Sequence, residues 1–267
     1  MSNQQSKPAK KEKVYMYGKH ALSEALTHAP RAIRKVFLDP SVKDTHLKEL
    51  IESANIPCAT LKENGASRVS AGAVHQGVIA TLDPSAILVP LESFLKTLDT
   101  SKAPAIVLLD EVQDPHNMGA IIRSAAAFGI SGVLIPERHQ VGITGAVVKT
   151  SAGMTFRVPL VAIGNVNQTV RLLKEAGFWI YGLTMAGEHP LAREHFNAPA
   201  CFILGNEGAG VRKKTRELCD VLLSIPMHPR CESLNVAASG ATVFYAWSTQ
   251  HEEALSGTKN SIATSQE

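Results

Sequence analysis

Residues 106–119 read IVLLDEVQDPHNMG, an apolar run that ends in an aspartate and passes through a polar turn into a segment with helical spacing. Two later segments have the same form. Residues 201–208 read CFILGNEG, and residues 224–237 read SIPMHPRCESLNVA. Each segment predicts a buried strand that ends in a turn of small and polar residues, and open α/β sheets bind ligands at such turns. The three segments therefore predict an α/β domain with a ligand site near the carboxyl ends of its strands.

An alternation of strands and helices extends over the whole region that contains these segments. Strands are expected at residues 105–110, 132–136, 157–163, 178–184, 201–205 and 221–226, and helices at residues 117–128, 144–151, 165–176, 209–218 and 235–250. Strands that alternate with helices of this length imply a mainly parallel sheet that is covered on both faces. We therefore expect an α/β domain over residues 104–253.

A second, smaller α/β domain is expected over residues 14–82. Its helices are expected at residues 20–28, 44–54 and 63–70, and its strands at residues 33–38, 58–61 and 77–82. The prolines at 84, 90 and 104 break this rhythm and predict a linker over residues 83–103. We expect disorder in the Lys-rich residues 1–13 and in the Ser/Thr-rich residues 254–267.

Composition narrows the class of protein. The chain has 267 residues, 45% of them hydrophobic, and a net charge of +3, which fits two globular domains and neither demands nor excludes nucleic acid. The cysteines at 58, 201, 219 and 231 lack paired spacing, so we expect reduced thiols and no metal site. No secretory signal or membrane-spanning run is evident, so we expect a cytoplasmic protein that contacts no membrane.

The first segment contains two candidate functional side chains. Asn117 is placed to cap the expected helix, and Arg123 follows six residues later. One interpretation is structural: a capping Asn, and an Arg paired with a surface carboxylate. However, the sequence SAAAFG follows Arg123, which predicts a tightly packed apolar helix. A guanidinium on such a helix has a high desolvation cost unless it meets an anion, and an RNA phosphate would serve.

The second and third segments together suggest a slot for a flat ligand. The glycines at 205, 208 and 210 allow the backbone to approach a ligand closely, although tight turns use the same residues. Residues 225–227 would supply an apolar wall, and residues 233–235 would supply polar groups, which together suit an adenine ring. The chain has no G-x-G-x-x-G fingerprint, Walker A lysine, nucleophile elbow or zinc-binding His pair. A dehydrogenase, a P-loop NTPase and a metallohydrolase are therefore disfavoured.

Residues 105–250 resemble the SpoU/TrmH family of S-adenosylmethionine-dependent RNA ribose 2′-O-methyltransferases, because the three segments occur in the order of that family's motifs. Residues 14–82, with YGKH at 17–20 and HQG at 75–77, resemble the L30e-like substrate-binding domain of its ribosomal RNA subgroup. The resemblance implies a SPOUT domain with a deep trefoil knot, S-adenosyl-L-methionine bound in a bent form in the knot, and a homodimer whose partner completes the site. It also implies that the substrate is a guanosine of 23S rRNA.

The resemblance assigns roles to individual residues. It implies catalytic roles for Asn117, Arg123, Glu207, Ser233 and Asn235, and cofactor contacts for Gly205, Ile225 and Leu234, with no metal. A guanidinium stays protonated, so Arg123 is expected to bind a phosphate and stabilise the developing alkoxide instead of acting as a base. The loop at residues 228–232 reads HPRCE, where relatives usually have small residues such as Gly and Ser. This departure leaves the precise target open.

Two alternatives remain open at this point. A tRNA target would use the same chemistry, although tRNA enzymes of this class usually recognise substrate through short terminal extensions and not through a separate domain. A non-catalytic RNA-binding protein of the same fold is disfavoured by the joint presence of the five motif residues. Candidate RNA contacts are Lys19, Arg31, Arg34 and Lys35 in the smaller domain, and Arg123, Lys149 and Arg230 in the larger one.

Overall fold

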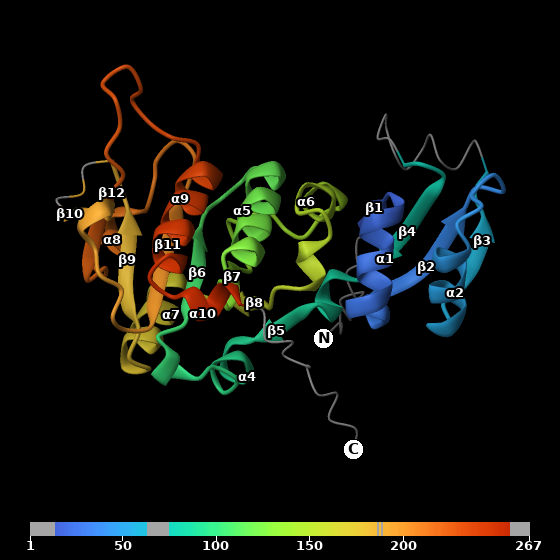
Figure 1. Ribbon diagram of the computed structural model, residues 1–267, viewed down its shortest axis with the longest axis horizontal. Helices are drawn as coiled ribbons and strands as arrows, with labels where there is room; N and C mark the ends of the chain where they lie inside the picture. Colours follow the sequence, from blue (N-terminus) through green and yellow to red (C-terminus); the bar gives the residue numbers. More distant parts are fainter. Residues whose placement is uncertain (1–13, 63–74, 186, 188, 257–267) are drawn as a thin grey trace, which may run out of the picture. The chain divides into compact units, whose positions relative to one another are not determined.

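The computed structural model describes residues 14–62, 75–185, 187 and 189–256. The chain divides into two compact units, residues 1–86 and residues 87–267, which we call the N-terminal unit and the C-terminal unit (Figure 1). Each unit has its own sheet, which bears out the prediction of two α/β arrangements in one chain.

The N-terminal unit is built on a mixed sheet in the order β1-β4-β2-β3. Its strands are β1 (Val14–Tyr17), β2 (Ile33–Leu38), β3 (Cys58–Thr60) and β4 (Val78–Leu82), and its helices are α1 (Lys19–His28) and α2 (Thr45–Ser53). Strand β4 is antiparallel to both neighbours, whereas β3 runs parallel to β2. The sequence did not predict β1, and the helix expected at 63–70 lies outside the described residues.

The C-terminal unit contains an eight-stranded sheet in the order β10-β12-β9-β11-β6-β7-β8-β5. Its strands are β5 (Leu88–Pro90), β6 (Ala105–Asp110), β7 (Gly132–Pro136), β8 (Leu160–Ile163), β9 (Trp179–Leu183), β10 (His189–Pro190), β11 (Ala200–Gly205) and β12 (Val221–Ser224). All neighbouring strands are parallel. Every residue of β6, β7 and β11 is buried, because helices cover a parallel sheet on both sides.

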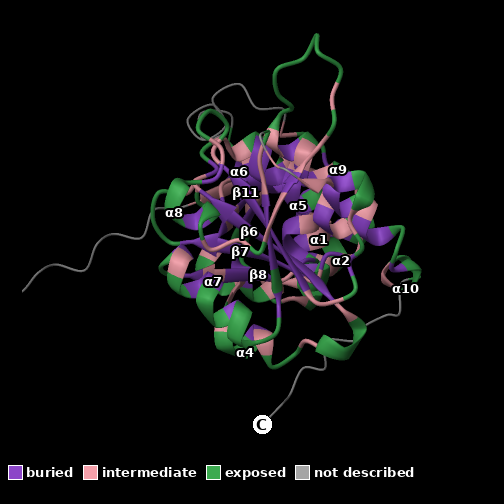
Figure 2. Ribbon diagram, turned by 90° about the vertical axis from the view of Figure 1, so that its left-hand side faces the viewer, coloured by how far each residue is buried: buried purple, intermediate pink, exposed green. Residues whose placement is uncertain are grey.

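Helices cover both faces of this sheet. They are α4 (Leu91–Leu95), α5 (Pro115–Ala127), α6 (Gly145–Thr150), α7 (Val166–Glu175), α8 (Lys213–Arg216), α9 (Val236–Ser248) and α10 (Glu252–Leu255). Figure 2 shows the buried strands between α4, α7 and α8 on one side and α5 and α9 on the other. The mainly parallel, doubly covered sheet is therefore confirmed.

Three sequence predictions about boundaries are wrong. Most of the linker predicted over 83–103 belongs to the C-terminal unit, because β5 pairs with β8 and Phe94 of α4 is only 4% exposed within the core. Pro90, one of the prolines that suggested a linker, lies at the end of the edge strand β5, where proline is tolerated. The helix expected at 209–218 is only the short α8, and α10 extends into the predicted C-terminal tail. Residues 1–13 and 257–267 lie outside the described residues.

The topology places a crevice at one edge of the sheet. Strands β6 and β11 are neighbours, but the chain leaves β6 toward α5 on one face and leaves β11 toward α8 on the other (Figure 2). Where connections diverge in this way, the loops beyond the carboxyl ends of the strands are held apart, and open α/β sheets bind ligands there.

Candidate functional site

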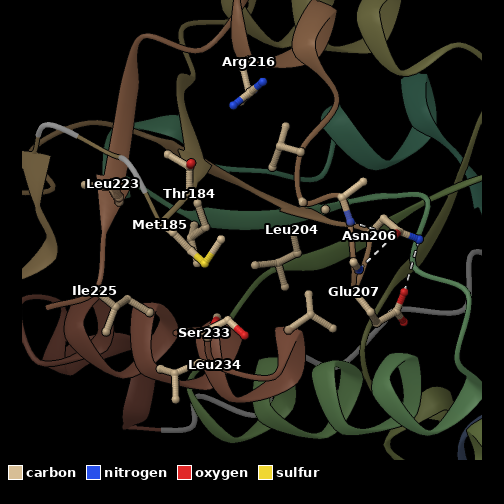
Figure 3. Close-up of a pocket in the computed structure, with 18 of the residues that line it drawn as sticks. Thr184, Met185, Leu204, Asn206, Glu207, Arg216, Leu223, Ile225, Ser233 and Leu234 are labelled. Atoms are coloured by element: carbon tan, nitrogen blue, oxygen red, sulfur yellow. Dashed lines mark hydrogen bonds between the residues drawn. The ribbon is translucent and has the colours of Figure 1, made fainter. Parts of the chain in front are cut away.

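A cavity of about 350 Å³ lies beyond the carboxyl ends of β9, β11 and β12. Its lining comes from the strand ends, the turn after β11 and the chain that leads into α9 (Figure 3). Apolar side chains form much of the wall: Met185, Leu204, Leu223, Ile225, Met227 and Leu234. The residues predicted to contact a cofactor, Gly205, Ile225 and Leu234, all line this cavity, as do Glu207 and Ser233.

Three of the predicted polar residues are joined by hydrogen bonds beside the cavity. Asn117 donates through Nδ2 to Oε1 of Glu207 at 3.0 Å, and Asn235 donates through Nδ2 to Oδ1 of Asn117 at 2.8 Å. One residue comes from each of the three sequence segments, so the fold brings together side chains that are 90 and 118 positions apart. We call Asn117, Glu207 and Asn235 the amide–carboxylate chain.

The carboxylate of Glu207 is held in its ionised form. Partial burial raises its pKa, but hydrogen bonds from Asn117 and from the backbone N–H groups of Asp114 and Gln113 outweigh burial, so the pKa lies below its ordinary value. Such donors stabilise a carboxylate and lower its basicity. Glu207 is therefore suited to orient the amide of Asn117 and is poorly suited to accept a proton.

Asn117 and Asn235 both lie at the start of a helix, and helix capping fixes their positions. The N-cap of α5 is Asp114, which accepts from the N–H of His116 at 2.8 Å with Pro115 in the first helical position. The prediction that Asn117 caps this helix is therefore wrong, although an Asp-Pro pair is a recognisable start signal. Asn117 lies in the first turn and is 8% exposed. Asn235 does cap α9, because its Oδ1 accepts from two backbone N–H groups.

An ion pair that the sequence analysis did not find joins the first two segments. Asp110 ends β6 with no exposed surface, and its Oδ1 lies 2.6 Å from the guanidinium of Arg212. The same guanidinium contacts Oε1 of Glu111 at 3.0 Å, and the carbonyl of Glu111 accepts from the side chain of Asn206. Glu111 adopts φ +68°, a conformation that needs support from its surroundings. This clamp holds the loop after β6 against the turn after β11.

Glycine is required in that turn for steric reasons. A Cβ on Gly205 would lie only 2.1 Å from the carbonyl carbon of Gly210, because the turn folds back on itself. Asn206 and Gly210 exchange backbone hydrogen bonds, and Oδ1 of Asn206 accepts from the N–H groups of Gly208 and Ala209. The glycines at 205, 208 and 210 all line the cavity, so part of its wall in this turn lacks side chains.

Arg123 does not line the cavity. Its side chain is exposed, so the predicted desolvation cost that would demand an anion is absent. Six residues after Asn117 on an α-helix, it projects about 240° around the axis and about 9 Å further along it. The loop at 228–232 is also exposed, between the lining residues Met227 and Ser233, and the thiol of Cys231 donates to the carbonyl of Ser233.

Comparison with known proteins places this chain in a family. Residues 104–245 match the model of the SpoU rRNA Methylase family, and residues 15–88 match the model for RNA 2′-O ribose methyltransferase substrate binding. The chain belongs to the SpoU rRNA methylase family. The 23S rRNA (guanosine-2′-O-)-methyltransferase RlmB of Neisseria meningitidis is 38% identical over 85% of this chain and 92% of its own length. The RlmB of Escherichia coli K12 is 35% identical over 86% and 96%.

Solved structures of this family share the fold. The SpoU methyltransferase AviRb from Streptomyces viridochromogenes, in complex with AdoMet, superposes with a TM-score of 0.78 at 23% identity, over 90% of this chain and 91% of that one. An AdoMet-bound rRNA methyltransferase from Sinorhizobium meliloti gives 0.75 at 22% identity, over 90% and 87%. The SpoU domain architecture expected from the sequence is confirmed.

The cavity suits a nucleoside-like cofactor. Its volume lies in the range of about 300–1,000 Å³ that small-ligand sites occupy, and it combines apolar walls with exposed backbone groups and few charges. Within the described residues no group of three or more His, Cys, Asp or Glu side chains could hold a metal ion. No helix in the described part of the chain is long and apolar enough to cross a membrane.

Proposed function

We propose that this chain transfers a methyl group from S-adenosyl-L-methionine to the ribose 2′-oxygen of a guanosine in 23S rRNA. The observation that carries this proposal is the amide–carboxylate chain beside a cavity with both apolar and polar walls at the carboxyl edge of a SpoU-type sheet. Relatives with 35–38% identity over most of their length bear the name 23S rRNA (guanosine-2′-O-)-methyltransferase, which supports the same substrate here.

The adenine ring would lie against Leu204, Ile225 and Leu234, with the backbone at Gly205 close to its plane. The sulfonium of the bound cofactor makes its methyl carbon electrophilic, so the protein's task is to position the attacking oxygen. We also infer the trefoil knot. In support, the chain runs from β12 through residues 225–235 into α9, which packs on both α5 and β11.

The amide–carboxylate chain would orient the ribose. Because Glu207 accepts from Asn117 and from two backbone N–H groups, its oxygens are already satisfied, and it acts as a positioning group. Asn117 is in turn held between Glu207 and Asn235, which fixes the direction of its amide. The hydroxyl of Ser233 lines the cavity and is free to contact the ribose. With Glu207 a weak base, the 2′-OH proton would leave to phosphate or water.

Arg123 would serve the cavity of a second copy of the chain. It projects away from the amide–carboxylate chain of its own copy, so a homodimer would be needed to bring its guanidinium to the substrate. There it would bind the phosphate beside the target ribose and stabilise charge on the developing alkoxide, which a permanently protonated group can do.

The N-terminal unit would bind the RNA. A bulge in β2 between Ile33 and Lys35 exposes two consecutive cations, Arg34 and Lys35. Arg34 pairs with Asp83, and the ammonium of Lys35 lies 5.2 Å from the ring centre of Phe37. Arg31, in the turn before β2, is exposed and is the best placed of the three to meet a phosphate.

Mapping of ribose methylation tests the function directly. A strain that lacks this chain should lose one 2′-O-methyl group from a guanosine of 23S rRNA, and a plasmid copy should restore it. Loss from a tRNA instead would contradict the rRNA target. Calorimetry with S-adenosylhomocysteine separates an enzyme from a pure RNA-binding protein, which should show no affinity for this ligand.

A further inference from the structure

Arg216, the last residue of α8, contributes a cationic side chain to the cavity wall. Among the nineteen described residues that line the cavity, only Arg216 and Glu207 carry a charge. Across residues 14–62, 75–185, 187 and 189–256, the side chain of Arg216 makes no ion pair or hydrogen bond, whereas Arg212, one turn earlier, is held by Asp110 and Glu111. Arg212 thus has two structural partners, whereas the exposed guanidinium of Arg216 has none among the described residues and lies at the edge of a cavity.

The two charged residues lie apart in the cavity. Figure 3 shows Arg216 well separated from Glu207, with Leu204 among the side chains between them. Glu207 is occupied by the donors described above, so it offers little to a ligand's charged end. A ligand anion that enters this cavity gives up part of its hydration, which a nearby cation can offset. Among the described lining residues, Arg216 is the one that can supply a cation.

We propose that Arg216 binds the carboxylate of the amino-acid part of S-adenosylmethionine, an inference that rests on the proposed function. This carboxylate is the cofactor's one anionic group, and a guanidinium can bind it through two parallel hydrogen bonds. An RNA phosphate is the competing anion. It fits less well, because a polymer backbone would pass outside a cavity of this size. Lys213 and Lys214 on the same helix are exposed, as Arg216 is, but unlike Arg216 they do not line the cavity.

A pair of ligands isolates the interaction without any measurement of activity. S-adenosylhomocysteine carries the carboxylate, whereas 5′-methylthioadenosine keeps the nucleoside and sulfur but lacks the amino-acid part. By calorimetry on the full chain, Arg216→Ala should weaken S-adenosylhomocysteine binding roughly ten- to hundredfold and leave 5′-methylthioadenosine within about twofold. The affinity of Arg216→Lys for S-adenosylhomocysteine should lie between that of the unmodified chain and that of Arg216→Ala, because lysine keeps the charge but loses the paired geometry. Lys214→Ala removes a charge from the same helix and should change neither affinity.

Retained binding of 5′-methylthioadenosine also shows that the variant pocket is folded. An equal loss for both ligands would overturn the proposal, because Arg216 would then act on the nucleoside or on the fold. Unchanged affinity for both ligands combined with weaker RNA binding would overturn it in favour of a phosphate contact. If the unmodified chain bound neither ligand, the proposed function itself would fail, which is a different result from failure of Arg216 alone.

Discussion

The two units of this chain differ in whether their functional polar side chains are paired within the protein or exposed on its surface. In the C-terminal unit several polar groups beside the cavity are paired with one another: Asn117, Glu207 and Asn235 form one chain, and Asp110 and Arg212 form a clamp. In the N-terminal unit the bulged strand β2 exposes its cations on the surface. A site that aligns a methyl group must be rigid before substrate arrives, whereas a surface that binds a polyanion needs accessible charge. We infer from this difference that chemistry and RNA recognition are divided between the units.

A similar contrast exists among the arginines of the C-terminal unit. Arg212 is paired and braces two loops, while Arg123 and Arg216 are both exposed and neither side chain has a hydrogen-bond or ion-pair partner among the described residues. An arginine with built-in partners supports the site. We infer that the two without them meet the ligands, Arg123 the RNA and Arg216 the cofactor.

The largest effect is expected for Arg123→Ala. Methyl transfer in single-turnover assays should fall by at least about 10²–10³-fold, because a group that stabilises developing charge is lost. Affinity for S-adenosylhomocysteine should stay within a few-fold, since Arg123 does not line the cavity of its own chain. Arg171→Ala, an exposed arginine on α7, is the matched control and should transfer methyl groups at the normal rate.

A mixed dimer then tests whether Arg123 acts in the partner copy. If each site combines Glu207 of one copy with Arg123 of the other, a dimer of an Arg123→Ala chain and a Glu207→Gln chain contains one site with both residues intact and one site with neither. Such heterodimers should recover activity toward half that of the unmodified dimer. If mixing restores nothing, the two residues serve the same copy and the shared site is excluded.

An intermediate effect is expected for Glu207→Gln. The neutral side chain loses charge-assisted hydrogen bonds, so the transfer rate should fall roughly tenfold and the free energy of unfolding by about 1 kcal/mol, a modest value because the carboxylate is partly exposed. Glu207 has a lowered pKa when folded, so its stabilisation is present above its ordinary pKa and is lost as the pH falls through the folded pKa.

Urea denaturation of both proteins at pH 7 and near pH 3 measures this stabilisation. The stability gap between the unmodified protein and Glu207→Gln should be clear at pH 7 and should shrink in acid. Glu232→Gln, in the neighbouring exposed loop, is the control and should show no gap at either pH. If the difference in unfolding free energy between the unmodified protein and Glu207→Gln grew in acid, Glu207 would not be an ionised carboxylate stabilised by hydrogen-bond donors.

The smallest effect is expected when Arg31, Arg34 and Lys35 are replaced together by Ala. Single-strand phosphate contacts contribute about 0.7 each to the salt slope of RNA affinity. Asp83 already neutralises Arg34, so the slope should flatten by about 1.4, equivalent to two contacts. Lys43 and Lys48 are exposed in the same unit, and their double replacement is the control. An unchanged slope in the triple variant would place the RNA surface elsewhere.

The sequence predicted the strands and helix starts that short local patterns determine. Buried runs followed by small-residue turns located β6 and β11, and Asn235 was correctly placed at the start of α9. The Asp110–Arg212 clamp joins residues 102 positions apart, and no periodicity encodes such a pairing. Helix α8 has four residues and ends at Arg216, whereas the sequence predicted a longer helix over residues 209–218.

The segment before β6 shows the same limit. The prolines at 84, 90 and 104 suggested a linker over residues 83–103, yet Val89, Phe94 and Leu98 pack against the core of the C-terminal unit. Edge strands of three residues carry too little pattern to be recognised until their neighbour in the sheet is known. The fragment that corresponds to the C-terminal unit therefore begins at residue 87 and not at residue 104, where the sequence placed the start of the larger domain.

The proposal that the N-terminal unit recognises RNA and the C-terminal unit carries out methyl transfer is tested most directly by comparing the fragment 87–267 with the full chain. One experiment measures both the affinity for S-adenosylhomocysteine and methyl transfer to 23S rRNA. The account predicts that the fragment binds the ligand within about threefold of the full chain, because the cavity lies within the C-terminal unit, but loses most of its transfer to RNA at low substrate concentration. A fragment that methylates rRNA as fast as the full chain would contradict the assignment of RNA recognition to the N-terminal unit.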